Sequence, residues 1–286
     1  MEPISRLNQN QPSVRPHRGL SRFLTFLIFL CVFLGIAGMI LSLTVLRESF
    51  TQEQLSEPKT LAAMTDKINV LLLDAAQKNG LPTEVQVKLL TQSDVRADLK
   101  KTVHNIYIGQ EKPLPTAQMM GQLAAHLEAV VPENALTESL IKTAVVAVQP
   151  PLQEYLTNQI EAPYLAPLAT EMLFVRNVIN ILTWVAIIMG IVLVLVQWGL
   201  SGQFRYVLGS VGASFAWSGL FLALGAAAFK YSGIVEQIAQ KAGDFNQTIT
   251  DYGLAVLDYG LKTSTIVLIG GAIVWLVATL LQRVRH

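Results

Sequence analysis

The chain has 286 residues and a net charge of +1; 52% of its residues are hydrophobic and only 14% are charged. Soluble globular proteins carry roughly a quarter charged residues, so this composition excludes an ordinary soluble domain and indicates membrane spans. Cys31 is the single cysteine, which excludes an intramolecular disulfide and a multi-cysteine metal site. A large domain without disulfides favours a bacterial envelope over a eukaryotic cell surface.

Four uncharged stretches are long enough to cross a bilayer, which takes roughly 20 apolar residues. Arginines precede the first stretch, as in a secretion signal. Its apolar core, however, exceeds the roughly 7–15 residues of a signal peptide, and no convincing cleavage site follows, so we expect an uncleaved anchor. The predicted spans are residues 23–46, 178–200, 206–229 and 263–281.

The segments between these spans differ in the sign of their charge. Residues 1–22, 201–205 and 282–286 together contain seven arginines and one acidic residue. Residues 47–177 contain 11 basic and 15 acidic residues, and residues 230–262 contain three basic and four acidic residues. Basic residues in short loops stay cytoplasmic. We therefore predict a plasma-membrane protein with cytoplasmic tails (1–22 and 282–286), a cytoplasmic link (201–205), and the two longer segments outside.

The outer segment 47–177 is long enough for a domain with its own core, and its apolar periodicity predicts helices throughout. We expect the prolines near its end to separate a short helix from one that runs into the second span. One expected helix has an apolar stripe from Leu61 to Ala75 and ends at Asn79-Gly80. The next helix begins after a Ser93 cap, and another begins at Thr116. Two further helices cover residues 136–148 and 152–160, and the second of these ends before Pro163 and Pro167.

The third and fourth spans are expected to extend outward as a helical hairpin. Residues 230–262 keep apolar side chains at steps of three and four, and Gly243-Asp244 suits the turn. The fold class is therefore an all-α integral membrane protein: four transmembrane helices, an all-helical extracytoplasmic domain between the first and second, and this hairpin between the third and fourth. The outer hairpin seam consists of Phe245, Ile249, Tyr252, Val256 and Tyr259.

The tetrapeptide Asp-Tyr-Gly-Leu occurs twice in this hairpin, seven residues apart. On a helix Asp251 and Asp258 would stand roughly 10–11 Å apart along the axis. This is too far for a retaining carboxylate pair and slightly beyond the inverting range. Tyr259 lies four residues before the last span, where interfacial aromatic residues belong. We interpret the repeat as a helical seam that enters the membrane surface, not as a catalytic pair.

In the first and third predicted spans, small residues gather on one face of the helix. The fourth predicted span contains the adjacent pair Gly270-Gly271. They indicate close helix packing, within one chain or between chains, because lipid supplies no hydrophobic drive between helices. The spans contain no charged residue, histidine or proline. This weakens an ion-coupled carrier and leaves an oligomeric pore open. The predicted helix-packing seam comprises Gly35, Gly38, Ser42, Ser210, Ser214, Ser218 and Gly225.

Sequence motifs for chemistry are lacking: the chain has no phosphate-binding loop, nucleophile elbow or zinc-binding pattern. His104 and His126, with Glu128 the nearest further ligand, are expected on solvated helix faces, so we predict no catalytic residue, metal or cofactor.

The predicted function is non-enzymatic binding, scaffolding or sensing through the outer domain. The expected partners are the lipid bilayer and other membrane or envelope proteins or a second copy, with no nucleic acid; the sequence does not indicate whether a small-molecule ligand binds. The alternative is a channel-forming or transport-accessory subunit that oligomerises through the small-residue faces; an enzyme is the least supported reading.

Overall fold

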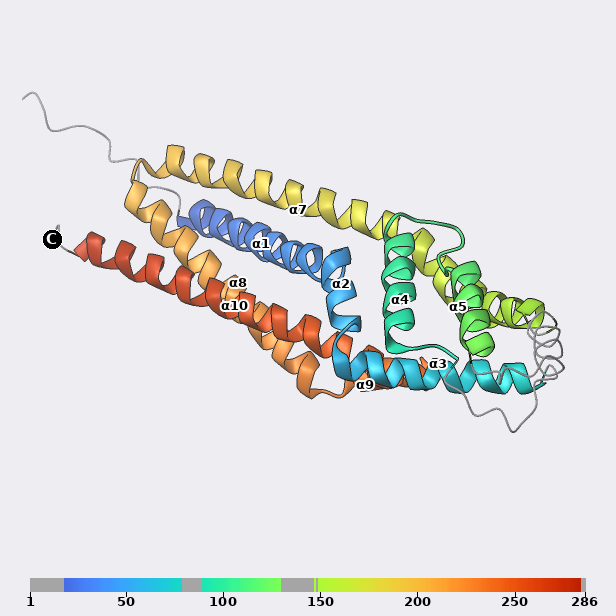
Figure 1. Ribbon diagram of the computed structural model, residues 1–286. Helices are drawn as coiled ribbons and strands as arrows, with labels where there is room; N and C mark the ends of the chain where they lie inside the picture. Colours follow the sequence, from blue (N-terminus) through green and yellow to red (C-terminus); the bar gives the residue numbers. More distant parts are fainter. Residues whose placement is uncertain (1–17, 79–88, 130–146, 148, 284–286) are drawn as a thin grey trace, which may run out of the picture. The chain divides into compact units, whose positions relative to one another are not determined.

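The computed structural model describes residues 18–78, 89–129, 147 and 149–283, and these residues are almost entirely helical (Figure 1). No β-strand occurs among them, which confirms the all-α prediction for the part of the chain that is described. The chain divides into two compact units. Unit 1 comprises Met1–Ile36, Thr183–Leu222 and Ser264–His286, and unit 2 comprises Ala37–Leu182 and Ala223–Thr263.

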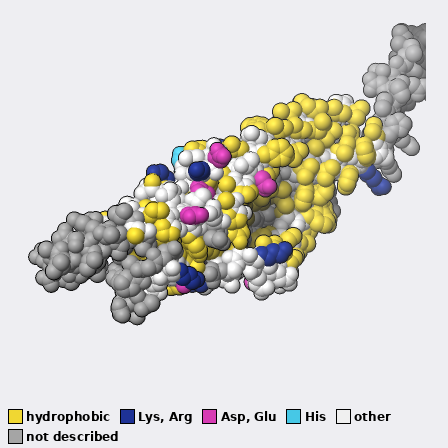
Figure 2. All heavy atoms as spheres, turned by 90° about the vertical axis from the view of Figure 1, so that its right-hand side faces the viewer, with side chains coloured by type: hydrophobic (Ala, Val, Ile, Leu, Met, Phe, Trp, Pro, Cys, Tyr) yellow, Lys and Arg dark blue, Asp and Glu magenta, His cyan; other side chains and the backbone are white. Residues whose placement is uncertain are grey.

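Within the described residues, four helices are long and apolar enough to cross a membrane. Three of them, α7, α8 and α10, contain a whole predicted span, whereas α1 ends at Leu43, three residues before the predicted end of the first span at 46. A large area of hydrophobic surface without charged side chains is visible in Figure 2. The helices are α1 (Arg18–Leu43), α7 (Ala166–Ser201), α8 (Phe204–Tyr231) and α10 (Asn246–Arg283).

Unit 2 contains shorter helices packed around an apolar core. Leu61, Leu72, Val95, Leu123 and Leu152 are among its fully buried side chains. Its elements, besides parts of the long helices, are α2 (Glu48–Leu55), α3 (Pro58–Lys78), α4 (Gln92–Tyr107), α5 (Thr116–Ala129), the π-helix η1 (Thr157–Leu165), α9 (Ile234–Gln240) and the 3-10 helix η2 (Gly243–Phe245). The predicted end at Asn79-Gly80 and the helix predicted over 136–148 lie outside the described residues, except for residue 147.

The helix α4 starts earlier than the predicted Ser93 cap. Thr91 is the N-cap: its hydroxyl accepts from the Asp94 N–H at 3.3 Å, and the Asp94 carboxylate accepts from the Thr91 N–H at 2.9 Å. This reciprocal capping box needs an acceptor side chain three residues after the cap. Ser93 is followed at that spacing by Arg96, which accepts nothing, so the cap falls on Thr91.

Prolines do not divide the helix before the second span, contrary to the prediction. The helical run extends from Gln149 to Ser201, with Pro163 inside η1. Proline lacks an N–H and its ring clashes with the carbonyl four residues back, and the wider π-turn accommodates both effects. Glu161, in the same turn, is buried and accepts a hydrogen bond from the Leu114 N–H at 3.1 Å.

The segment between the third and fourth spans is less regular than a simple hairpin. The helix α8 ends at Tyr231, and Gly233 has a φ of +72°, in the left-handed region that favours glycine. Gly243, where a turn was predicted, has a φ of +56°. From Asn246 onward α10 continues without interruption into the fourth span.

Candidate ligand-binding site

Unit 2 encloses a cavity of about 620 Å³, here called the apolar cavity. Small-molecule sites are typically cavities of about 300–1,000 Å³ with mostly apolar walls. Residues from α3, α4, α5, η1, α7 and the segment from η2 to α10 form the wall. Its apolar side chains include Ile68 and Leu71 of α3, Leu99 of α4, Met119 of α5, Phe245 of η2 and Ile249 of α10.

Asp98 of α4 is the acidic residue in the described wall of the apolar cavity. It is only 4% exposed, and its Oδ1 accepts from Gln118 Nε2 at 2.8 Å and Gln122 Nε2 at 3.4 Å. Its Oδ2 is buried and has no hydrogen-bond partner among the described residues. Burial raises the pKa of the Asp98 carboxyl to about 6, so a modest change of surroundings can switch its charge.

Because the folded-state pKa of Asp98 is raised, its contribution to stability is greatest below about pH 4 and is lost as the pH rises through about 6. The rise of the Asp98 pKa from its ordinary value of 3.8 to about 6 corresponds to roughly 3 kcal/mol. The variant Asp98→Asn has no such group, so its thermal stability relative to wild type should increase between pH 4 and pH 7. Melting temperatures in detergent across this range would measure the effect.

Asp74→Asn is the matched control, because Asp74 is exposed and paired with Lys78 at 2.7 Å. Because exposed ion pairs contribute little to stability, the melting temperature of this variant should stay close to that of wild type. An Asp98→Asn profile parallel to that of wild type would show that the buried carboxyl does not titrate in this range.

The predicted outer hairpin seam faces two different neighbours. Phe245 and Ile249 line the apolar cavity. Further along α10, the rings of Tyr252 and Tyr259 meet the ring of Phe50 of α2 edge-on, at centroid distances of 6.3 and 6.0 Å. The Tyr252 hydroxyl also lies 3.0 Å from the Thr51 hydroxyl. Val256, on the same helix, is half-buried.

The two copies of Asp-Tyr-Gly make equivalent kinds of contact. Each aspartate faces a lysine: Asp251 lies 4.0 Å from Lys59, and Asp258 is hydrogen-bonded to Lys230. Each glycine lies beside an aliphatic side chain. A Cβ added to Gly253 would lie 2.8 Å from Val235 of α9, and one added to Gly260 would lie 3.7 Å from Ile40 of α1. Each aspartate thus has a lysine partner. The two copies of the repeat, seven residues apart, place α10 in contact first with α9 and then with α1.

Two of the three α8 serines in the predicted packing seam, Ser210 and Ser218, form hydrogen bonds with other helices of the same chain. Ser210 Oγ lies 2.9 Å from Thr25 Oγ1 of α1 and 3.1 Å from Gln197 Nε2 of α7. Ser218 Oγ donates to the Phe29 carbonyl of α1 at 3.3 Å. Ser214 is buried and donates to the Ser210 carbonyl at 2.9 Å. The serine face of α8 is therefore occupied within unit 1.

The small residues predicted on α1 make looser contacts. A Cβ added to Gly35 would lie 3.7 Å from Ile187 of α7, and Gly38 is half-buried. Ser42 donates to Asn180 Oδ1 at 3.2 Å within unit 2. Gly225 of α8 has no heavy atom within 4 Å of the position of an added Cβ, so no close packing occurs there.

Glycines let the backbones of α8 and α10 approach closely. A Cβ added to Gly212, Gly219 or Gly271 would lie 2.6, 2.5 or 2.4 Å, respectively, from a backbone nitrogen of the facing helix. Gly271 was recognised as part of the Gly270-Gly271 pair, but Gly212 and Gly219 were missed. Their seven-residue spacing, two helical turns on one face, is the signal that could have identified them.

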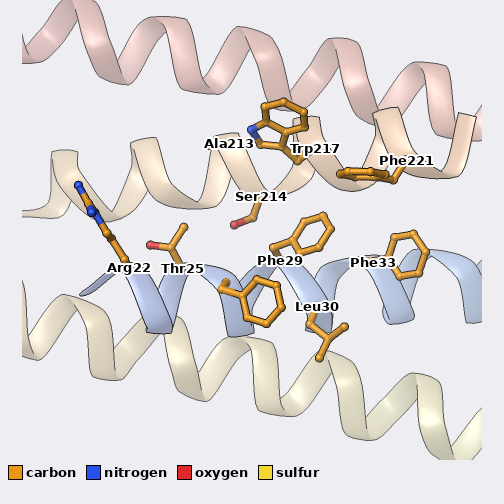
Figure 3. A pocket seen from close by; sticks show the side chains of 10 residues that line it. Arg22, Thr25, Phe29, Leu30, Phe33, Ala213, Ser214, Trp217 and Phe221 are labelled. Atoms are coloured by element: carbon orange, nitrogen blue, oxygen red, sulfur yellow. The ribbon is translucent and has the colours of Figure 1, made fainter. Parts of the chain in front are cut away.

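A groove of about 750 Å³ runs between α1 and α8 in unit 1. Figure 3 shows the aromatic rings of Phe29 and Phe33 of α1 and of Trp217 and Phe221 of α8 along the groove, with Arg22 at one end. Its wall is almost wholly apolar, as expected of a surface exposed to lipid chains.

The two candidate histidines lie on separate helices and pair with different carboxylates. His104 Nδ1 of α4 lies 3.0 Å from Glu48 Oε1, and His126 Nε2 of α5 lies 2.8 Å from Asp94 Oδ2. The structure does not bring the two histidines to one site.

Comparison with known proteins adds no relative: no protein-family model, curated protein or solved structure matches the chain.

Proposed function

We propose that the chain is a non-enzymatic, multi-pass membrane protein that binds an apolar small molecule through unit 2. The observation that carries this proposal is the apolar cavity, a space of ligand size bounded by side chains from helices far apart in the sequence. Asp98 and Lys241 are the charged side chains in its described wall. A few polar groups in an apolar wall fix a ligand's orientation, so we infer a ligand with an apolar body and one hydrogen-bonding group.

We further propose that the chain lies in a bacterial plasma membrane, with both termini cytoplasmic and residues 47–177 outside. The excess of arginine in the short flanking segments supports this orientation. With Cys31 replaced by alanine, Glu111→Cys should react with a membrane-impermeant maleimide in intact cells. Gln203→Cys should react only after lysis. Reaction of Gln203→Cys in intact cells would reverse the proposed orientation.

The binding proposal predicts that filling the apolar cavity displaces its ligand. Leu71→Trp puts an indole where the half-buried Leu71 lines the wall. Fitting the ligand beside the added indole would cost about 1–3 kcal/mol, as overpacking of a core does, so the affinity for the ligand should fall about tenfold. Two measurements report occupancy: native mass spectrometry of the full chain released from detergent, and crosslinking in membranes with a fatty acid that carries a photoreactive diazirine.

Val70→Trp is the control for this experiment. Val70 adjoins Leu71 on α3, is 59% exposed and is not part of the cavity wall. The variant Val70→Trp should retain both the bound molecule and the fatty-acid crosslinks to α3 and α4. Thermal unfolding of both variants checks that they fold. Equal crosslinking in two folded variants would contradict binding in the apolar cavity.

A further inference from the structure

Unit 2 contains a second hollow, of about 510 Å³, near the end of α1 and the start of α2. We call it the arginine pocket. Unlike the apolar cavity, its wall is mainly polar. Its wall includes Ser42, Arg47, Glu48, Gln52, Arg176 and Asn180.

Both guanidinium groups of the arginine pocket have donors that the protein leaves unused. Arg47 Nε donates to Ser49 Oγ at 2.9 Å. The Arg176 side chain forms no hydrogen bond or ion pair with any residue that the structure describes. A guanidinium carries five N–H donors in a planar fork, so most of the donors of this pair are available to a ligand.

The acidic residue in this wall does not neutralise the arginines. Glu48 Oε1 accepts from Gln52 Nε2 at 2.9 Å and lies 3.0 Å from His104 Nδ1. No ion pair joins Glu48 to Arg47 or Arg176 in the described part of the chain. The Asn180 carbonyl accepts from Ser42, which leaves the Asn180 amide nitrogen as one more donor. The pocket is therefore rich in donors for an anion.

The position of the arginines along the chain places them beside the membrane. Arg47 is the first charged residue after the apolar stretch 23–46, and Arg176 is the last before 178–200. Charged residues that flank a span lie at the depth of the lipid headgroups. Arginine binds phosphate oxygens in a bidentate manner, which a lysine cannot do.

We propose that the arginine pocket binds a phosphate group between the Arg47 and Arg176 guanidiniums. The phosphate belongs to an anionic lipid headgroup or to a soluble phosphate compound, since both present the same oxygens. This site is separate from the apolar cavity, because the two walls share no residue.

The test uses the full chain in detergent and two kinds of ligand. Phosphatidylglycerol adducts are counted by native mass spectrometry, with diacylglycerol as the lipid that lacks a phosphate. Inorganic phosphate is titrated separately while the melting temperature is recorded. A response to phosphatidylglycerol alone identifies a lipid headgroup, and a shift with inorganic phosphate identifies a soluble ligand. A response to neither phosphate source, or equal binding of diacylglycerol and phosphatidylglycerol, overturns the proposal.

Variants then assign the response to the two arginines. Arg47→Gln and Arg176→Gln should each weaken binding about tenfold, the effect of losing charge-assisted hydrogen bonds. Arg96→Gln removes the same charge from an exposed site on α4 outside the pocket and should bind normally. Equal losses in all three variants, or none in any, would overturn the assignment.

A second measurement needs no variant and so does not depend on folding. Phenylglyoxal modifies exposed arginines, and Arg176 is exposed. In the wild-type chain, the ligand identified above should slow modification of Arg176 and leave Arg96 unaffected. Unchanged modification of Arg176 at saturating ligand would overturn the proposal.

Discussion

Gly271→Ala should lower the melting temperature of the protein markedly, although it adds only one methyl group. The added Cβ would lie 2.4 Å from the Ala216 nitrogen and 2.8 Å from the Phe215 carbonyl carbon. These are backbone atoms of α8, so the clash is relieved only if α8 and α10 move apart. Overpacking typically costs about 1–3 kcal/mol, and Gly271→Val should cost more than Gly271→Ala.

Gly270→Ala is the matched control, one residue away on the same helix. No heavy atom lies within 4 Å of its added Cβ. Alanine is favoured over glycine in a helix by roughly 0.5–1 kcal/mol, so this variant should be as stable as wild type or slightly more stable. Thermal unfolding in detergent compares the two. Equal melting temperatures for Gly270→Ala and Gly271→Ala would disprove the close contact between α8 and α10.

Tyr252→Ala should be the most destabilising single change in the Asp-Tyr-Gly-Leu repeat. It removes the ring that packs edge-on against Phe50 and the hydroxyl that lies 3.0 Å from Thr51. Truncating a buried aromatic side chain costs about 3–5 kcal/mol, and the half-buried Tyr252 should fall near the lower end. Tyr252→Phe keeps the ring and should lose about 1 kcal/mol, the worth of one hydrogen bond.

The double variant Asp251→Asn, Asp258→Asn is the comparison for Tyr252→Ala. It keeps the size of both side chains and removes only their charges, which face lysines in partly exposed ion pairs. Exposed ion pairs contribute little to stability. Thermal unfolding and limited proteolysis of unit 2 should therefore resemble wild type. A double variant less stable than Tyr252→Ala would mean that the charges, not the rings, hold α10 in place.

The parts of the fold that depend on neighbouring residues in the chain were predictable from the sequence. The four helices that are long and apolar enough to cross a membrane follow from runs of apolar residues, because a spanning helix needs roughly 20 of them in succession. Helices such as α3 and α5 follow from their three- and four-residue periodicity. The Thr91 cap was also readable in principle, since Asp94 completes a capping box that Ser93 lacks.

Helix continuity through Pro163 and the identity of packing partners were decided by tertiary structure. A proline in the sequence predicts that the helix breaks. In the structure a π-turn accommodates Pro163 and keeps the helix continuous, and the same turn forms contacts with other segments, such as the hydrogen bond from the Leu114 N–H to Glu161. Small residues mark a packing face but do not name its partner, so Gly225 and Gly271 look alike in sequence and differ in the structure.

The candidate binding sites also arise from tertiary structure. The apolar cavity joins Leu71, Leu99 and Phe245, which are distant in sequence, and each of them separately resembles an ordinary core residue. The arginine pocket likewise joins Arg47 and Arg176 across 129 positions of the sequence.

The sequence by itself determined which segments are helical and which suit a membrane, because those properties depend on local composition. Only the packing of the helices created the two hollows, because a cavity is defined by side chains that meet from separate elements.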